Sequence, residues 1–182
     1  MGRETLRRVS EDAMEIADCT TACPGCGAVV PDVEAPVHAY VPSAAGCWLT
    51  FGEVQADEAL RFGYPPTHRV VVDAWMAQHP GDGSDRRERQ SLFLHLVGLC
   101  ALLVQEIPAA HATRAFSRLL RRREDFPILH GGPDRGELTI LDLAKACDLA
   151  DYDRRARDWG RIVWETWRPQ HPLIQEALDE VL

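Results

Sequence analysis

The chain has 182 residues, of which 46% are apolar, and a formal net charge of −8. This length suits one domain, or one domain with a small appendage, and the apolar fraction is sufficient for a buried core. The acidic balance argues against general binding to nucleic acid or to an anionic membrane, because both favour a basic protein surface.

The N-terminal stretch "MGRETLRRVSEDAMEIADC" carries charges throughout and lacks the apolar run of a secretory signal. The longest apolar run covers residues 96–104, well short of the ~20 residues that a membrane-spanning helix needs. We therefore expect a cytoplasmic protein without a membrane span. In a reducing compartment, the six cysteines are more typical of a metal or redox site than of structural disulfides.

We expect three segments that form one compact unit. Residues 1–18 are an N-terminal helix or tail. Residues 19–47 hold four of the six cysteines and neither Lys nor Arg, and prolines interrupt their short apolar pieces. This composition indicates a loop-rich knuckle with at most a small hairpin. Residues 48–182 are an α-helical domain.

The knuckle contains the motif "CPGCG", in which Cys23 and Cys26 flank a Pro-Gly turn. Such a turn can direct two sulfur atoms at one metal ion, and Zn²⁺ prefers thiolate and imidazole ligands in tetrahedral sites. His38 and Cys47 lie nearby in the sequence and complete a self-contained set of four ligands. The sequence therefore predicts Zn²⁺ bound by Cys23, Cys26, His38 and Cys47.

The remaining chain has helical periodicity and few alternating strand patterns. Thr139, with Asp142 three residues later, forms a weak capping box for one short helix. We expect a mainly α protein: a bundle of about six helices that carries the N-terminal zinc knuckle. The helices are predicted at residues 46–62, 67–79, 86–105 and 109–123, from 139 onward, at 151–167, and in a last turn or two before 182.

Three polar residues of the helical domain are candidates for catalytic roles. His95 lies in the most apolar predicted helix, where a buried imidazole needs a partner, and Ser91 lies one turn before it on the same face. Asp73 and His79 are six residues apart, which on one helix places them about 120° from each other. In an alternative arrangement, Cys23 and Cys26 share the metal with His79 or His95, and an open position admits a water for hydrolysis.

Several spaced motifs occur in order: "CPGCGA", "VHAYVPSAAGCW", "VDAWMAQHPG", "RQSLFLHLVGLC" and "VWETWRPQHPLI". Together they resemble an uncharacterised bacterial family of unknown function, over roughly residues 20–175. The resemblance implies a shared polar site and no particular reaction. The positions that it implies are Cys23, Cys26, His38, Tyr40, Cys47, Asp73, Gln78, His79, Gln90, Ser91, His95 and His171.

Four functions compete. The first is a small metal-dependent enzyme or sensor, in which Asp73, His79 and His95 act on an unknown small molecule. The second is a zinc-stabilised adaptor that binds a partner protein. A DNA-binding regulator is disfavoured by the acidic charge, and a thioredoxin-like redox pair by the absence of a preceding strand pattern. No nucleic-acid or membrane partner is expected.

Overall fold

The computed structural model describes residues 19–122, 125–131 and 135–182. The helix or tail predicted over residues 1–18 lies outside the described residues. In the described part the elements are mostly helices, and one two-stranded sheet accompanies them, so the prediction of a mainly α fold is confirmed. Their bounds, in chain order, are β1 Thr20–Ala22, β2 Val29–Pro31, α2 Ala45–Phe62, α3 His68–Gln78, α4 Arg86–Leu99, a π-helical turn Cys100–Val104, α5 Ala109–Arg122, α6 Ile140–Leu143, α7 Leu149–Thr166, a 3-10 turn Arg168–Gln170 and α8 His171–Asp179.

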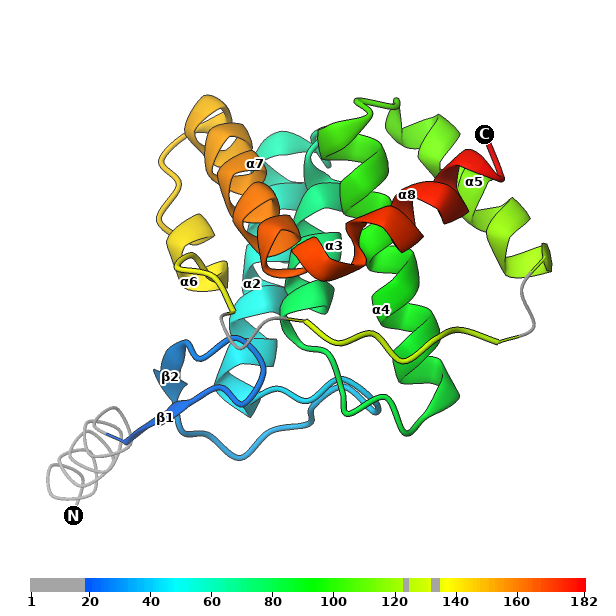
Figure 1. Cartoon of the computed structure of the whole chain (residues 1–182). Helices are drawn as coiled ribbons and strands as arrows, with labels where there is room; N and C mark the ends of the chain where they lie inside the picture. Colours follow the sequence, from blue (N-terminus) through cyan, green and yellow to red (C-terminus); the bar gives the residue numbers. More distant parts are fainter. Residues whose placement is uncertain (1–18, 123–124, 132–134) are drawn as a thin grey trace, which may run out of the picture.

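Strands β1 and β2 form an antiparallel hairpin at one end of the molecule (Figure 1). The "CPGCG" motif is the turn that joins them. The Cys23 N–H donates to the Ala28 carbonyl at 2.8 Å, and the Gly27 N–H donates to the Cys23 carbonyl at 2.9 Å. Gly27 has φ +77°, a left-handed conformation that glycine adopts without steric cost. These two hydrogen bonds and the left-handed glycine define the geometry of the turn.

Local signals explain where several helices begin. Asp85 precedes α4 and Asp148 precedes α7, and each carboxylate accepts a backbone N–H of the first turn. Thr139 and Asp142 form the predicted capping box at the start of α6. Such caps satisfy N–H groups that have no partner within the helix, which is worth about 1 kcal/mol each.

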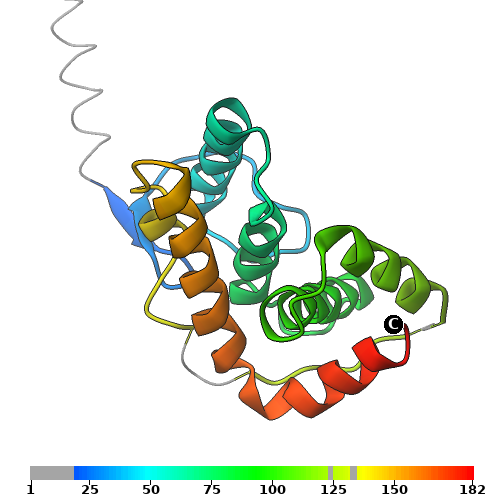
Figure 2. The same ribbon diagram turned by 90° about the horizontal axis from the view of Figure 1, so that it is seen from above.

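Helix α3 is central, with α2, α4 and α7 around it, and α8 crosses from the end of α7 toward α5 (Figures 1 and 2). Two tryptophans of the α7 region form hydrogen bonds with the C-terminal end of α3. The Trp159 Nε1–H donates to the Gln78 side-chain oxygen at 3.0 Å, and the Trp167 Nε1–H donates to the Ala77 carbonyl at 3.2 Å. These bonds fix the direction in which the chain leaves α3, and His79 is the next residue.

A buried carboxylate links three helices on the other side of the bundle. Glu58 of α2 is fully buried and accepts the Tyr152 hydroxyl of α7 at 2.5 Å and the His68 Nδ1–H of α3 at 2.9 Å. Burial and the Glu58 bond raise the pKa of Tyr152, so its hydroxyl keeps its proton and remains a donor.

Replacing Tyr152 by phenylalanine should destabilise the fold by about 1–3 kcal/mol, because Glu58 then loses one partner inside the bundle. For a chain of this size the melting temperature should fall by roughly 3–10 °C in thermal unfolding followed by circular dichroism. Tyr64→Phe is the matched control, since Tyr64 is 62% exposed. Equal melting temperatures for the two variants would contradict this role of Glu58.

Candidate metal centre

Four side chains converge where the hairpin meets the helices: Cys23, Cys26, Cys47 and His79. Their potential ligand atoms all lie within 4.8 Å of one another, and all four residues are buried. The His79 Nε2 lies 3.3 Å from the Cys23 Sγ and 3.5 Å from the Cys47 Sγ, and the Cys26 and Cys47 sulfur atoms are 3.8 Å apart. This buried group could hold a metal ion.

The distances fit tetrahedral coordination. Ligand bonds of about 2.3 Å to sulfur and about 2.0–2.1 Å to nitrogen place two sulfurs about 3.8 Å apart and a sulfur about 3.5 Å from a nitrogen. The three separations given above agree with these values. All six cysteines of the chain are free, so no disulfide competes for the sulfur atoms.

Three separate parts of the fold supply the four ligands. Cys23 and Cys26 belong to the hairpin turn, Cys47 lies in the first turn of α2, and His79 follows α3 directly. Gly25 permits this arrangement, since a Cβ on it would lie 2.1 Å from the Cδ2 atom of the His79 ring. The turn therefore approaches the imidazole more closely than any residue with a side chain allows.

Backbone contacts orient the ligands. The His79 Nδ1–H donates to the Trp75 carbonyl at 2.6 Å, and the imidazole stacks on the Trp75 ring with centroids 4.0 Å apart. The Nε2 atom therefore faces the sulfur atoms. A carbonyl behind a ligating histidine is a common feature of metal sites, because it fixes the tautomer and raises basicity. The Ala44 N–H donates to the Cys23 Sγ at 3.4 Å.

The thiols and the imidazole of the cluster shift one another's pKa values. Hydrogen bonds with Cys26 and Cys47 lower the pKa of Cys23, against the effect of burial, whereas bonds with Cys23 and Cys26 raise the pKa of Cys47. Burial lowers the pKa of His79, but its bonds with Cys23 and Cys26 outweigh that effect and raise the pKa to about 9. Three adjacent sulfurs repel one another when ionised, and a divalent cation removes that repulsion.

A family model described as a family of unknown function (DUF5946) matches residues 21–168. The chain belongs to this family. The match covers all four members of the cluster, and it agrees with the resemblance noted from the spaced motifs. Comparison with curated proteins finds no match, and neither does comparison with solved structures.

In this DUF5946 chain the fourth member of the cluster is His79 rather than His38. The His38 ring packs edge-on against Tyr40 and Trp48, with centroids 4.5 and 5.3 Å away, and its Nδ1 accepts the Tyr40 N–H at 3.5 Å. The knuckle therefore does not close on itself as the sequence predicted. The end of α3 supplies the imidazole. The cluster therefore combines Cys47, from the self-contained arrangement predicted for the knuckle, with His79, from the alternative arrangement.

The other predicted site residues lie elsewhere. Asp73 and His95 contact each other between α3 and α4, with 2.7 Å between Oδ1 and Nδ1, and neither belongs to the cluster. His171 stacks on Trp164, and the Trp164 carbonyl accepts its Nε2–H at 2.9 Å. The roles of Trp75 and Ala44 had no signal in the sequence, because their hydrogen bonds to the cluster come from backbone groups.

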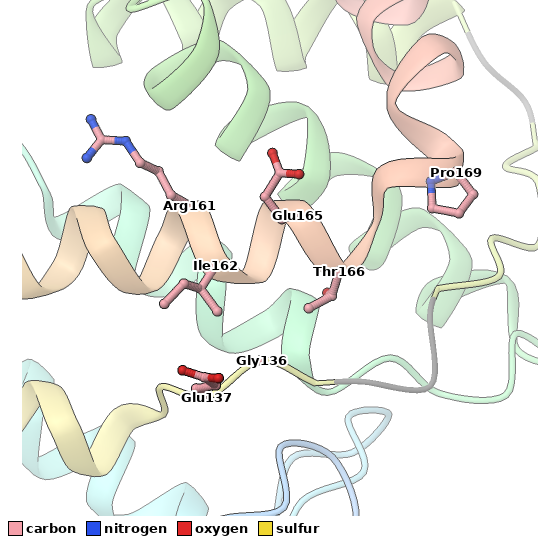
Figure 3. Close-up of a pocket in the computed structure, with 7 residues that line it drawn as sticks. All are labelled: Gly136, Glu137, Arg161, Ile162, Glu165, Thr166 and Pro169. Carbon is pink, nitrogen blue, oxygen red and sulfur yellow. The ribbon is translucent and has the colours of Figure 1, made fainter.

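The cavity beside the cluster is too small for a substrate. The cavity that His79 lines, with Tyr40, Glu88 and Ser91 among its other residues, has a volume of about 10 Å³, roughly the room for one water. A wider hollow of about 580 Å³ lies between the loop at Gly136 and Glu137 and helix α7 (Figure 3). None of the predicted site residues lines it.

Proposed function

We propose that the chain binds one Zn²⁺ through Cys23, Cys26, Cys47 and His79, and that the ion has a structural role. The observation that carries this proposal is the buried set of four protein ligand atoms, all within 4.8 Å of one another. Structural zinc sites are four-coordinate, whereas catalytic zinc sites keep one position for water or substrate. The 10 Å³ cavity beside His79 also supports a closed site.

The ion would join parts of the chain that local interactions do not hold together. The hairpin is a small unit, and a two-stranded hairpin alone is marginally stable in water. One ion would connect its turn to the start of α2 and to the end of α3. The bond between the Ala44 N–H and the Cys23 sulfur would anchor the end of the 32–44 connection to the same centre.

Removing the metal tests this function. Protein purified without added metal should contain one zinc per chain, measured by inductively coupled plasma mass spectrometry. Stripping it with a chelator under reducing conditions should lower the melting temperature by more than about 10 °C, since structural zinc sites supply several kcal/mol of folding free energy. Adding back one equivalent of Zn²⁺ should restore it. Chains without metal, or an unchanged melting temperature after stripping, would refute the proposal.

Co²⁺ substitution distinguishes a structural ion from a catalytic one. A closed site of three thiolates and one imidazole should give a tetrahedral ligand-field spectrum that azide or cyanide at millimolar concentration leaves unchanged, because no position is open. A spectrum that changes on addition of these anions would show an open position, and the metal-dependent enzyme would then be the better function.

A further inference from the structure

A cavity of about 510 Å³ lies where helix α5 meets the connection that follows the π-helical turn. The connection lines it with residues 105–108, and the segment after α8 lines it with residues 181 and 182. Helix α5 contributes His111, Arg114 and Arg118. The volume is in the range of small-molecule sites, about 300–1,000 Å³, and none of the proposed zinc ligands lines the cavity.

The basic side chains line this cavity because they share one face of α5. His111, Arg114 and Arg118 are spaced by three and four residues, which places them one above the other along the helix. The buried side chains of Ala112 and Leu119 belong to the face that packs against the bundle. Packing of the apolar face therefore sets the direction of the basic one.

Helix α5 differs in charge from the other described α-helices. It contains four arginines and neither Asp nor Glu, although the chain has 28 acidic residues, and each of the other α-helices that the structure describes contains at least one acid. Arg155 of α7, for comparison, pairs with Asp151 at 2.8 Å. Within the described residues, Arg114 and Arg118 have no Asp or Glu at ion-pair distance. Their charge is therefore available to a ligand.

Backbone carbonyls orient both guanidinium groups and leave donors over. The Arg118 Nη1 donates to the Val181 and Leu182 carbonyls at 2.7 and 3.3 Å, and the Arg114 Nε–H donates to the Ala110 carbonyl at 3.3 Å. Each group thus uses one of its three nitrogens in these bonds. A guanidinium carries five N–H donors in a planar fork that matches a carboxylate or a phosphate. The remaining nitrogens can bind such a group.

The connection that forms another wall is fixed by the π-helical turn. The Gln105 N–H donates to the Cys100 carbonyl at 3.0 Å, and the Ile107 N–H donates to the Ala101 carbonyl at 2.8 Å. Between them Glu106 has φ +51°, a left-handed conformation that is uncommon for a residue with a side chain. Single π-helical turns occur frequently at functional sites. The arginines therefore face a cavity with a defined wall.

The wider hollow beside Gly136 does not offer the same chemistry (Figure 3). Its arginine, Arg161, pairs with Asp158 at 3.8 Å, and the Glu165 in its lining pairs with Arg168 at 3.5 Å. The cationic group there already has a carboxylate partner. The cavity at α5 is therefore the better candidate for a charged ligand.

We propose that the cavity lined by Arg114 and Arg118, here called the arginine cavity, binds a small organic anion that carries one carboxylate or phosphate on an apolar body. The two arginines bind the anionic group through charge-assisted hydrogen bonds. Ile107 and Pro108 provide apolar surface for the body. Glu106 also lines the cavity, and its carboxylate repels further negative charge, so a single anionic group is favoured over a polyanion.

The test titrates the full-length, zinc-loaded chain at constant ionic strength and follows ¹H–¹⁵N NMR shifts. Phenyl phosphate and benzoate are the probes, and they distinguish the two anionic groups on one aryl body. At least one should bind with a Kd below about 1 mM, with shifts centred on residues 105–118. Inorganic phosphate and benzyl alcohol, which each lack one half of the ligand, should bind about tenfold more weakly or worse.

Three variants locate the binding. Arg114→Gln and Arg118→Gln should each raise the Kd of the better probe about tenfold or more, because each removes a charge-assisted hydrogen bond. Arg121→Gln is the matched control, since Arg121 is an exposed arginine of the same helix that does not line the cavity. Its Kd should stay within about twofold of the wild-type value, because an exposed charge outside the site contributes little.

Absence of saturable binding by both probes would overturn the proposal. An equal loss of affinity in Arg121→Gln would overturn it too, because general attraction to the basic helix would then explain the binding. Equal affinity for inorganic phosphate would disprove the apolar half of the ligand. Circular dichroism and zinc content are measured on each preparation, so a failed zinc proposal is recognised separately. If Arg118→Gln does not fold, Arg114→Gln compared with Arg121→Gln decides the outcome.

Discussion

His79→Ala is expected to weaken zinc binding on the order of a hundredfold, whereas His38→Ala should leave the zinc affinity unchanged. His79 contributes the imidazole that completes the buried cluster, and His38 lies outside it against Tyr40 and Trp48. If structural zinc binding supplies about 10–16 kcal/mol over four ligands, one ligand accounts for about 3 kcal/mol, or on the order of a hundredfold in affinity. Competition with a chromophoric chelator measures the change.

Two further variants sharpen this comparison. Cys26→Ser should weaken zinc binding as much as His79→Ala, because it removes a different ligand of the same ion. Cys100→Ser should leave zinc content unchanged. Cys100 is also a buried cysteine, but it lies in the π-helical turn and does not belong to the cluster. The assignment of the cluster would be wrong if His38→Ala lost the metal while His79→Ala kept it.

Gly25→Ala should disrupt the metal centre although it changes no ligand. The added Cβ would lie 2.1 Å from the His79 Cδ2 and 2.8 Å from the Pro42 carbonyl oxygen, so the turn and the imidazole must move apart. Overpacking of this kind costs about 1–3 kcal/mol, and separation of the ligands lowers zinc affinity further. We expect at least a tenfold loss of affinity and a lower melting temperature in the zinc-loaded protein.

Two other glycines provide controls for Gly25. A Cβ at Gly27 meets nothing within 4 Å but sits at φ +77°, so Gly27→Ala should cost only the backbone strain, about 1 kcal/mol. Gly52, in α2, has open space and ordinary helical geometry, so Gly52→Ala should be neutral or stabilising by up to about 1 kcal/mol. Zinc affinity that falls equally in all three variants would show that contact with His79 is not the cause.

The helices could be predicted because their signals are local. Apolar periodicity and caps such as Thr139 with Asp142 depend on residues within a turn or two, and α2, α3, α5 and α7 begin and end within a few residues of the expected bounds. The predicted helix over residues 86–105 continues as expected, but its last turn is π-helical from Cys100 to Val104. Sequence periodicity does not distinguish these two hydrogen-bonding patterns, because both keep the same apolar residues buried.

Three of the four members of the candidate metal centre, Cys23, Cys26 and Cys47, were among the ligands predicted from the sequence. Cys23 and Cys26 are held by one short turn, so their convergence follows from local geometry, and Cys47 lies close enough to join them. The choice between His38 and His79 depended on packing, because the Trp159 and Trp167 bonds to the end of α3 set where the chain after Gln78 runs.

The contact between Asp73 and His95 also depended on how the helices pack. Helical geometry predicted that Asp73 and His79 face different directions. Asp73 contacts His95 because α4 approaches α3 closely at Gly98. Contacts between helices depend on how whole faces pack, which no short stretch of sequence encodes. The residue types with the chemistry were therefore visible in the chain, and the tertiary structure decided which of them meet.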